Sequence, residues 1–163
     1  MTWVLRLASF RRWKDKDAEK AAKDLELRDQ EEGLSVFKVD DPEDADRIGV
    51  LFGMYRRTKP REVDYVLIPE RCLASFRLVA RPDPSLPAEM GALHYEIEGM
   101  REVEGASLAL ARAVLADDAT QVKHLREAEV LSIAATLVDE DPARKAVLSE
   151  DWLRSLAEWK PAR

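Results

Sequence analysis

The chain has 163 residues, which is long enough to bury a hydrophobic core in one domain without a disulfide or a structural metal. It carries 26 Lys and Arg against 32 Asp and Glu, and this formal net charge of −6 disfavours non-specific attraction to nucleic acid or an anionic membrane. The single cysteine, Cys72, excludes an intramolecular disulfide. No apolar segment approaches the roughly 20 residues that cross a bilayer. We therefore expect a soluble cytoplasmic protein.

The first 69 residues alternate between strand and helix patterns. The helix that follows Asp41 has the clearest signals, because Asp41 suits the N-cap, Pro42 suits the first helical position, and cations precede Pro60 at the negative end of the helix dipole. Apolar residues recur along it every three or four positions, so one side is expected to lie on a sheet. The predicted strands are 2–10, 34–39 and 63–69, and the predicted helices are 15–27 and 42–59.

If these three strands are parallel, their carboxyl ends share one edge of the sheet, where open α/β sheets bind ligands. That edge would bring Asp40 close to Arg71 and Cys72, with Arg11 and Arg12 after the first strand. An antiparallel order would scatter these residues. The pattern of apolar residues does not choose between the two orders.

The second half of the chain changes from extended to helical patterns. A short helix and then extended chain are predicted over 70–80, a proline-rich loop over 81–87, a strand over 93–98, and helices over 104–116, 118–141 and 150–160. The predicted fold is α+β or α/β, with a mixed sheet of about four strands, packed helices and a helical C-terminal third. We predict one domain, 1–163, with a sheet-containing part at 1–98 and a helical part at 104–163.

Three polar residues share one face of the strand at 93–98. Alternation places His94, Glu96 and Glu98 together, and an imidazole beside two carboxylates can bind a metal or move a proton. A solvated sheet face has the same composition and is the simpler interpretation. No further ligand is identifiable, so we assign neither a metal nor a cofactor, and the three residues are catalytic candidates only.

Cys72 is the other catalytic candidate. The neighbouring cation Arg71 can stabilise its thiolate, although a lone cysteine is more commonly a small buried apolar residue. The six glycines form no phosphate-binding motif.

Three features suggest contact with a partner. Gly49 and Gly53 are four residues apart on one helix and would form a groove for close approach, either by the chain's own sheet or by a partner. The C-terminal helix carries Trp152 and Trp159, which pack on the chain's own core or bind a partner. The basic run 55–61 has the composition of a contact surface for anions. The candidate partner-binding residues are Trp152, Trp159, Gly49, Gly53, Arg56 and Arg57.

The absence of catalytic motifs favours a non-catalytic, cytosolic protein-interaction or regulatory domain that acts through a protein partner or forms a homo-oligomer. A small metal-dependent or acid/base enzyme is the alternative, using the face of His94 or the edge of Asp40 and Arg71. A second alternative, which the net charge disfavours, is nucleic-acid binding through two basic pairs, Arg56 with Arg57 and Arg11 with Arg12.

Overall fold

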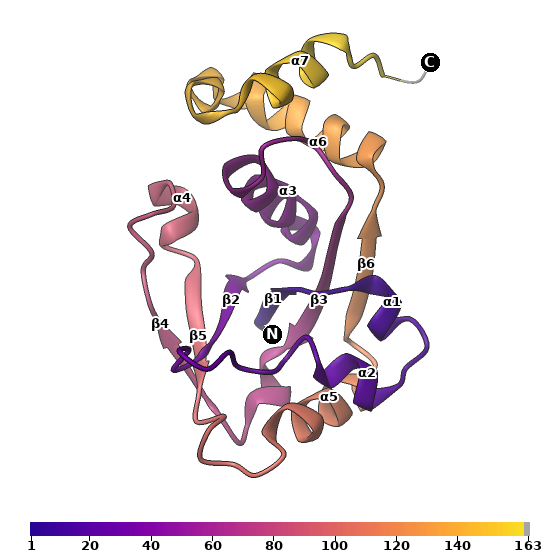
Figure 1. Cartoon of the computed structure of the whole chain (residues 1–163), viewed down its shortest axis with the longest axis vertical. Helices are drawn as coiled ribbons and strands as arrows, with labels where there is room; N and C mark the ends of the chain where they lie inside the picture. Colours follow the sequence, from indigo (N-terminus) through magenta and orange to yellow (C-terminus); the bar gives the residue numbers. More distant parts are fainter. Residues whose placement is uncertain (162–163) are drawn as a thin grey trace.

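The computed structural model describes residues 1–161 and contains, within that range, a six-stranded sheet in which every neighbouring pair of strands is antiparallel (Figure 1). The spatial order is β4-β5-β2-β1-β3-β6. The strands are β1 (Trp3–Leu7), β2 (Leu34–Val39), β3 (Val63–Pro69), β4 (Arg77–Ala80), β5 (His94–Glu98) and β6 (Gln121–Leu125).

Helices cover both faces of this sheet. The first face is covered by α1 (Phe10–Trp13), α2 (Ala18–Ala22) and α5 (Ala106–Ala116). The second is covered by α3 (Ala45–Arg56), α4 (Ala88–Gly91), α6 (Glu127–Glu140) and α7 (Glu150–Glu158). Short 3-10 helices lie at Pro42–Asp44, Glu70–Leu73 and Pro142–Val147. Among these described helices, none combines the length and the apolar character that a bilayer crossing requires.

The neighbouring strands β1 and β3 are buried on both sides. In β1, Val4 faces the first core and Leu5 the second, and both side chains are fully buried. In β3, Val66 faces the first core and Leu67 the second, and both side chains are again fully buried. Strands buried on both faces have continuous apolar runs instead of alternating ones, which explains the sequence of β3.

Gly49 allows α3 to lie close against β3. A Cβ atom at Gly49 would come within 3.3 Å of the Val63 side chain and 3.4 Å of the Tyr65 ring. The Tyr65 hydroxyl donates a 2.6 Å hydrogen bond to Asp46, one turn earlier in α3. The groove predicted at Gly49 and Gly53 is therefore occupied by the chain's own strand.

The predicted fold class was wrong in the number and direction of the strands. The sheet has six antiparallel strands, where a mixed sheet of about four was expected. The strand β6 lies inside the segment 118–141 that was predicted as one helix. Pairing with the edge of β3 outweighs the modest helix propensity of these five residues, and α6 begins only at Glu127.

The antiparallel order also separates the residues that were expected to share one ligand-binding edge of the sheet. Because β2 and β3 both run antiparallel to β1, Asp40 and Arg71 follow strand ends on the same edge, whereas Arg11 and Arg12 follow β1 at the opposite edge. The Arg71 guanidinium forms two hydrogen bonds with Asp117, at 2.5 and 2.6 Å. Within residues 1–161, no hydrogen bond or ion pair joins Arg71 to Asp40.

Two glycine substitutions test the close packing of α3. Gly53→Ala is expected to raise the free energy of unfolding by about 0.5–1 kcal/mol, because alanine favours helix and the new methyl group would lie at an ordinary 3.7 Å from Val63. Gly49→Val is expected to lower the free energy of unfolding by about 1–3 kcal/mol through overpacking. Urea unfolding measures both values, and stabilisation by both substitutions would contradict the close approach at Gly49.

Candidate functional site

Residues 57–62, here called the basic loop, connect α3 to β3 and are held from two sides. The Arg57 amide donates to the Gly53 carbonyl at 2.9 Å, which ends α3. From the other side, the Trp152 indole N–H donates to the Arg57 carbonyl at 2.9 Å, and the Ser149 hydroxyl donates to the Thr58 carbonyl. The backbone of the loop is therefore fixed by the beginning of α7, which lies over it.

Ser149 is also the N-cap of α7, because its hydroxyl oxygen accepts a hydrogen bond from the Trp152 amide at 3.3 Å. One serine thus begins the helix and anchors the basic loop, so the position of α7 and the position of the loop are coupled.

Two adjoining depressions of about 620 and 490 Å³ border the basic loop and share Lys59, Arg61 and Glu127 in their walls. Cations outnumber acids around them, in contrast to the chain as a whole, whose formal net charge is −6. The lining cations are Arg56, Arg57, Lys59, Arg61 and Arg154, and the lining acids are Glu62, Glu127 and Asp151.

The positive charge of the basic loop is poorly compensated. The Arg57 guanidinium donates to the backbone carbonyl of Glu62 at 2.6 Å. Its pKa is lowered first by burial and then by repulsion from Arg61. Within residues 1–161, no ion pair involves Lys59 or Arg61, so both are available to an external anion.

The structure covers four of the six predicted partner-binding residues with other parts of the same chain. Trp152 is fully buried and Trp159 packs partly buried against the same core. Both tryptophans therefore contact their own domain. Gly49 and Gly53 are covered by β3, so Arg56 and Arg57 are the members of the predicted set that border the open depressions.

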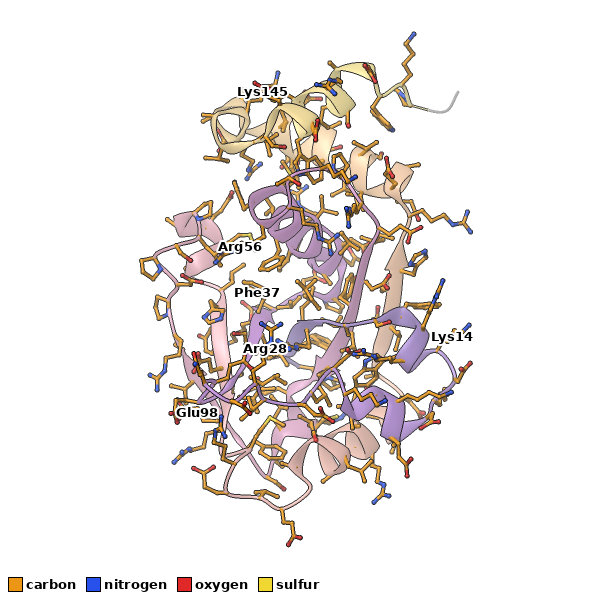
Figure 2. The ribbon with its side chains drawn as sticks, in the orientation of Figure 1. Lys14, Arg28, Phe37, Arg56, Glu98 and Lys145 are labelled. Carbon is orange, nitrogen blue, oxygen red and sulfur yellow. The ribbon has the colours of Figure 1, made fainter. Side chains whose placement is uncertain are left out.

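A smaller pocket of about 220 Å³, distinct from the two depressions, lies between the sheet, α3 and the loop 81–87. We call it the His94 pocket. Figure 2 shows Phe37 and Arg56 near one another between α3 and β5, where both contribute to its wall. The pocket is lined by five apolar residues, Leu5, Leu7, Phe37, Phe52 and Leu86, and five polar ones, Arg6, Ser35, Arg56, Asp83 and His94.

His94 is oriented by two hydrogen bonds. One ring nitrogen, Nδ1, lies 2.5 Å from the Arg81 carbonyl oxygen, and the other, Nε2, lies 3.2 Å from the Ser35 hydroxyl. The imidazole also packs against the Phe37 ring in a T-shaped arrangement, with 5.8 Å between the ring centroids.

The acidic residues of the same face do not join His94. Glu98 lies 2.5 Å from Arg81 and 3.7 Å from Arg77, and Glu96 lies 3.9 Å from Arg81. The predicted trio therefore separates into an ion-paired cluster and a histidine that contacts a serine. In the part of the chain that the structure describes, no three His, Cys, Asp or Glu side chains are placed to hold a metal ion.

Asp83 and Arg56 close one side of the His94 pocket. Arg56 donates to the Ser85 hydroxyl at 2.8 Å and lies 3.3 Å from Asp83. Hydrogen bonds from the Ser85 side chain and backbone lower the pKa of Asp83, and Arg56 and His94 lower it further. Asp83 is thus held as a carboxylate at neutral pH.

Cys72 lies in the 3-10 helix after β3, away from both pockets. Its sulfur is 3.6 Å from an Asp117 carboxylate oxygen. Burial and then the charge of Asp117 raise its pKa to about 11, although Arg71 acts in the opposite direction. The nearby cation is already bound to Asp117, so it does not activate the thiol as its position in the sequence suggested.

Sequence reasoning did not identify Ser35 or Asp83 as site residues. Alternation in 34–39 places Ser35 on the same face as Phe37, but its contact with His94 depends on the pairing of β2 with β5, which no local pattern reveals.

The chain matches no protein-family model, no curated protein and no solved structure.

The raised pKa predicts a slow reaction of Cys72 with a disulfide reagent such as dithiobis-nitrobenzoate near neutral pH. The native thiol is expected to react on the order of ten-fold or more slowly than the same thiol in guanidinium-unfolded protein, because the thiolate is the reactive form. Absorbance of the released thionitrobenzoate follows the reaction. The variant Asp117→Asn removes the repulsive carboxylate and should react faster than the native protein, whereas equal native and unfolded rates would contradict the assignment.

Proposed function

We propose that the protein is an interaction module whose basic loop binds an acidic segment of a partner protein. The observation that carries this proposal is the presentation of Lys59 and Arg61, without intramolecular ion pairs among the described residues, on a backbone held by Trp152 and Ser149. A cationic side chain on a fixed backbone loses less conformational freedom on binding than one on a flexible tail. The charge also steers an acidic partner toward this surface.

The shape of the surface supports a peptide ligand. Two depressions meet at Lys59 and Arg61, so an extended acidic segment can place successive side chains in both. Three acids at the rim, Glu62, Glu127 and Asp151, provide sites for cations or hydrogen-bond donors of the partner. A mixed rim of this kind fixes the register of a ligand and rejects partners with the wrong order of charges.

A protein partner fits this surface better than a nucleic acid does. A duplex presents its phosphates over a long distance, and the net charge of −6 opposes such a polyanion. The second predicted basic pair lies elsewhere, since Arg11 and Arg12 belong to α1, which packs on the opposite face of the sheet from α3. Arg12 is also paired with Asp24 at 2.5 Å.

Charge reversal in the basic loop tests the proposal. The double variant Lys59→Glu with Arg61→Glu is expected to weaken binding of a fluorescein-labelled peptide of alternating glutamate and leucine by about ten-fold or more, because attraction at the loop becomes repulsion. Fluorescence anisotropy at low ionic strength gives the dissociation constants, and added salt should weaken wild-type binding.

The matched control is Arg11→Glu with Lys14→Glu, which makes the same change of charge on exposed residues of the opposite face. This control should bind the peptide within about two-fold of the wild type. Equal losses in the two double variants, or tighter binding to duplex DNA than to the peptide at equal salt, would overturn the proposal.

The anchoring role of Trp152 predicts a separate effect. The variant Trp152→Phe keeps an aromatic ring but leaves the Arg57 carbonyl without its indole donor, and it should lower the free energy of unfolding by about 1–3 kcal/mol. The same variant should weaken peptide binding although every loop charge is retained. Urea unfolding and anisotropy measure the two effects, and unchanged binding in a destabilised variant would show that the held backbone contributes nothing to recognition.

A further inference from the structure

We infer that Ser35 and His94 form a nucleophile and general base for the hydrolysis of short-chain carboxylic esters. This site lies in the His94 pocket, which shares Arg56 with the larger depression but contains neither Lys59 nor Arg61, so the inference does not depend on the proposed partner. It rests on three features: the orientation of the imidazole, the space beside Ser35, and the chemistry of the pocket walls.

The contacts of His94 determine which nitrogen carries the proton. A backbone carbonyl only accepts hydrogen bonds, so Nδ1, which lies 2.5 Å from the Arg81 oxygen, is the protonated nitrogen of the neutral ring. The unprotonated nitrogen is then Nε2, which faces the Ser35 hydroxyl at 3.2 Å. A serine that donates to a histidine, itself oriented by a third group, is the arrangement that activates a hydroxyl nucleophile.

The group that orients His94 is held firmly. The Arg81 amide donates to the His94 carbonyl at 3.0 Å, so the two residues bond through both the backbone and the ring. Further along the same loop, the Asp83 amide donates to the Gly91 carbonyl at 3.3 Å. A Cβ atom at Gly91 would come within 2.5 Å of the Asp83 carbonyl oxygen, so only glycine permits this close contact.

Space beside Ser35 arises because β2 leaves β1 at this point. The pairing of the two strands ends at Leu5 with Phe37, and beyond it the Ser35 carbonyl accepts a 2.8 Å hydrogen bond from the Arg6 guanidinium in place of a strand partner. The His94 pocket opens at this separation. Ser35 therefore lines the pocket where β2 has lost its partner β1, while on its other side it stays paired with Glu96 of β5.

The walls of the pocket define the class of substrate. Its apolar residues accept a hydrocarbon group, and a volume of about 220 Å³ corresponds to roughly seven water molecules, which limits the acyl chain to a few carbons. Arg56 lines the same pocket, is held there by Ser85 and Asp83, and is the cation that the pocket offers to a tetrahedral oxyanion.

The reaction proceeds in two steps, acylation of Ser35 and hydrolysis of the acyl-serine. Ser35 Oγ attacks the ester carbonyl carbon while His94 Nε2 accepts the hydroxyl proton, and His94 then gives this proton to the alkoxide as the ester C–O bond breaks. The products of this step are an acyl-serine and a free alcohol. Water then attacks the acyl group, His94 takes its proton and returns it to Ser35 Oγ as the acyl bond breaks, and a carboxylic acid leaves.

Covalent labelling with a fluorophosphonate tests the nucleophile directly. The intact wild-type protein should take up one equivalent, and peptide mapping by mass spectrometry should place it on Ser35. Hydrolysis of para-nitrophenyl butyrate should begin with a burst and should fall by about a hundred-fold or more in Ser35→Ala and in His94→Gln. The variant His124→Gln, which changes the other histidine, should label and hydrolyse as the wild type does.

Circular dichroism and urea unfolding establish that each variant is folded, and the mapping experiment on wild-type protein stands even if a variant is not. The inference is overturned by a wild-type protein that leaves Ser35 unlabelled, by hydrolysis that persists in folded Ser35→Ala, or by equal labelling rates in wild type and folded His94→Gln.

Discussion

The burial of β1 and β3 on both faces is the constraint on which the rest of the structure depends. Neither strand has a side that can face water, so helices must cover both sides of the sheet: α2 and α5 on one, α3 and α6 on the other (Figure 1). Polar chemistry is thereby displaced to the ends and margins of these strands. The basic loop lies where the chain enters β3, and the His94 pocket lies where β1 stops pairing with β2.

The helix α3 links the two candidate sites. Gly49 lets it approach β3 closely, and the last turn of the helix ends at Arg56, which lines both the larger depression and the His94 pocket. A displacement of α3 would therefore move the entrance to the basic loop and one wall of the pocket together.

Local signals located the first three strands and α3, but not the arrangement of the elements. Asp41 was predicted to cap a helix that begins at Pro42, and its carboxylate does accept the Glu43 amide at 2.9 Å, but it caps the 3-10 helix Pro42–Asp44 and α3 begins only at Ala45. The apolar run of β3 was compatible with a parallel sheet because burial on both faces produces the same composition in either direction. The contact between the Ser35 and His94 side chains could not be predicted for a related reason. The two residues are 59 positions apart in the sequence, and they meet only because β2 and β5 are neighbours in the sheet.

The two edge strands of the sheet affect how separate molecules of the protein associate. Strands β4 and β6 end the sheet on either side, and among residues 1–161 each leaves one row of backbone amides and carbonyls without a strand partner. β4 is only four residues long and carries the exposed Arg77, while β6 carries the exposed Lys123. A short edge strand and exposed basic side chains on edge strands are features that oppose edge-to-edge pairing of sheets, so both margins of this sheet are poor templates for a strand of another molecule.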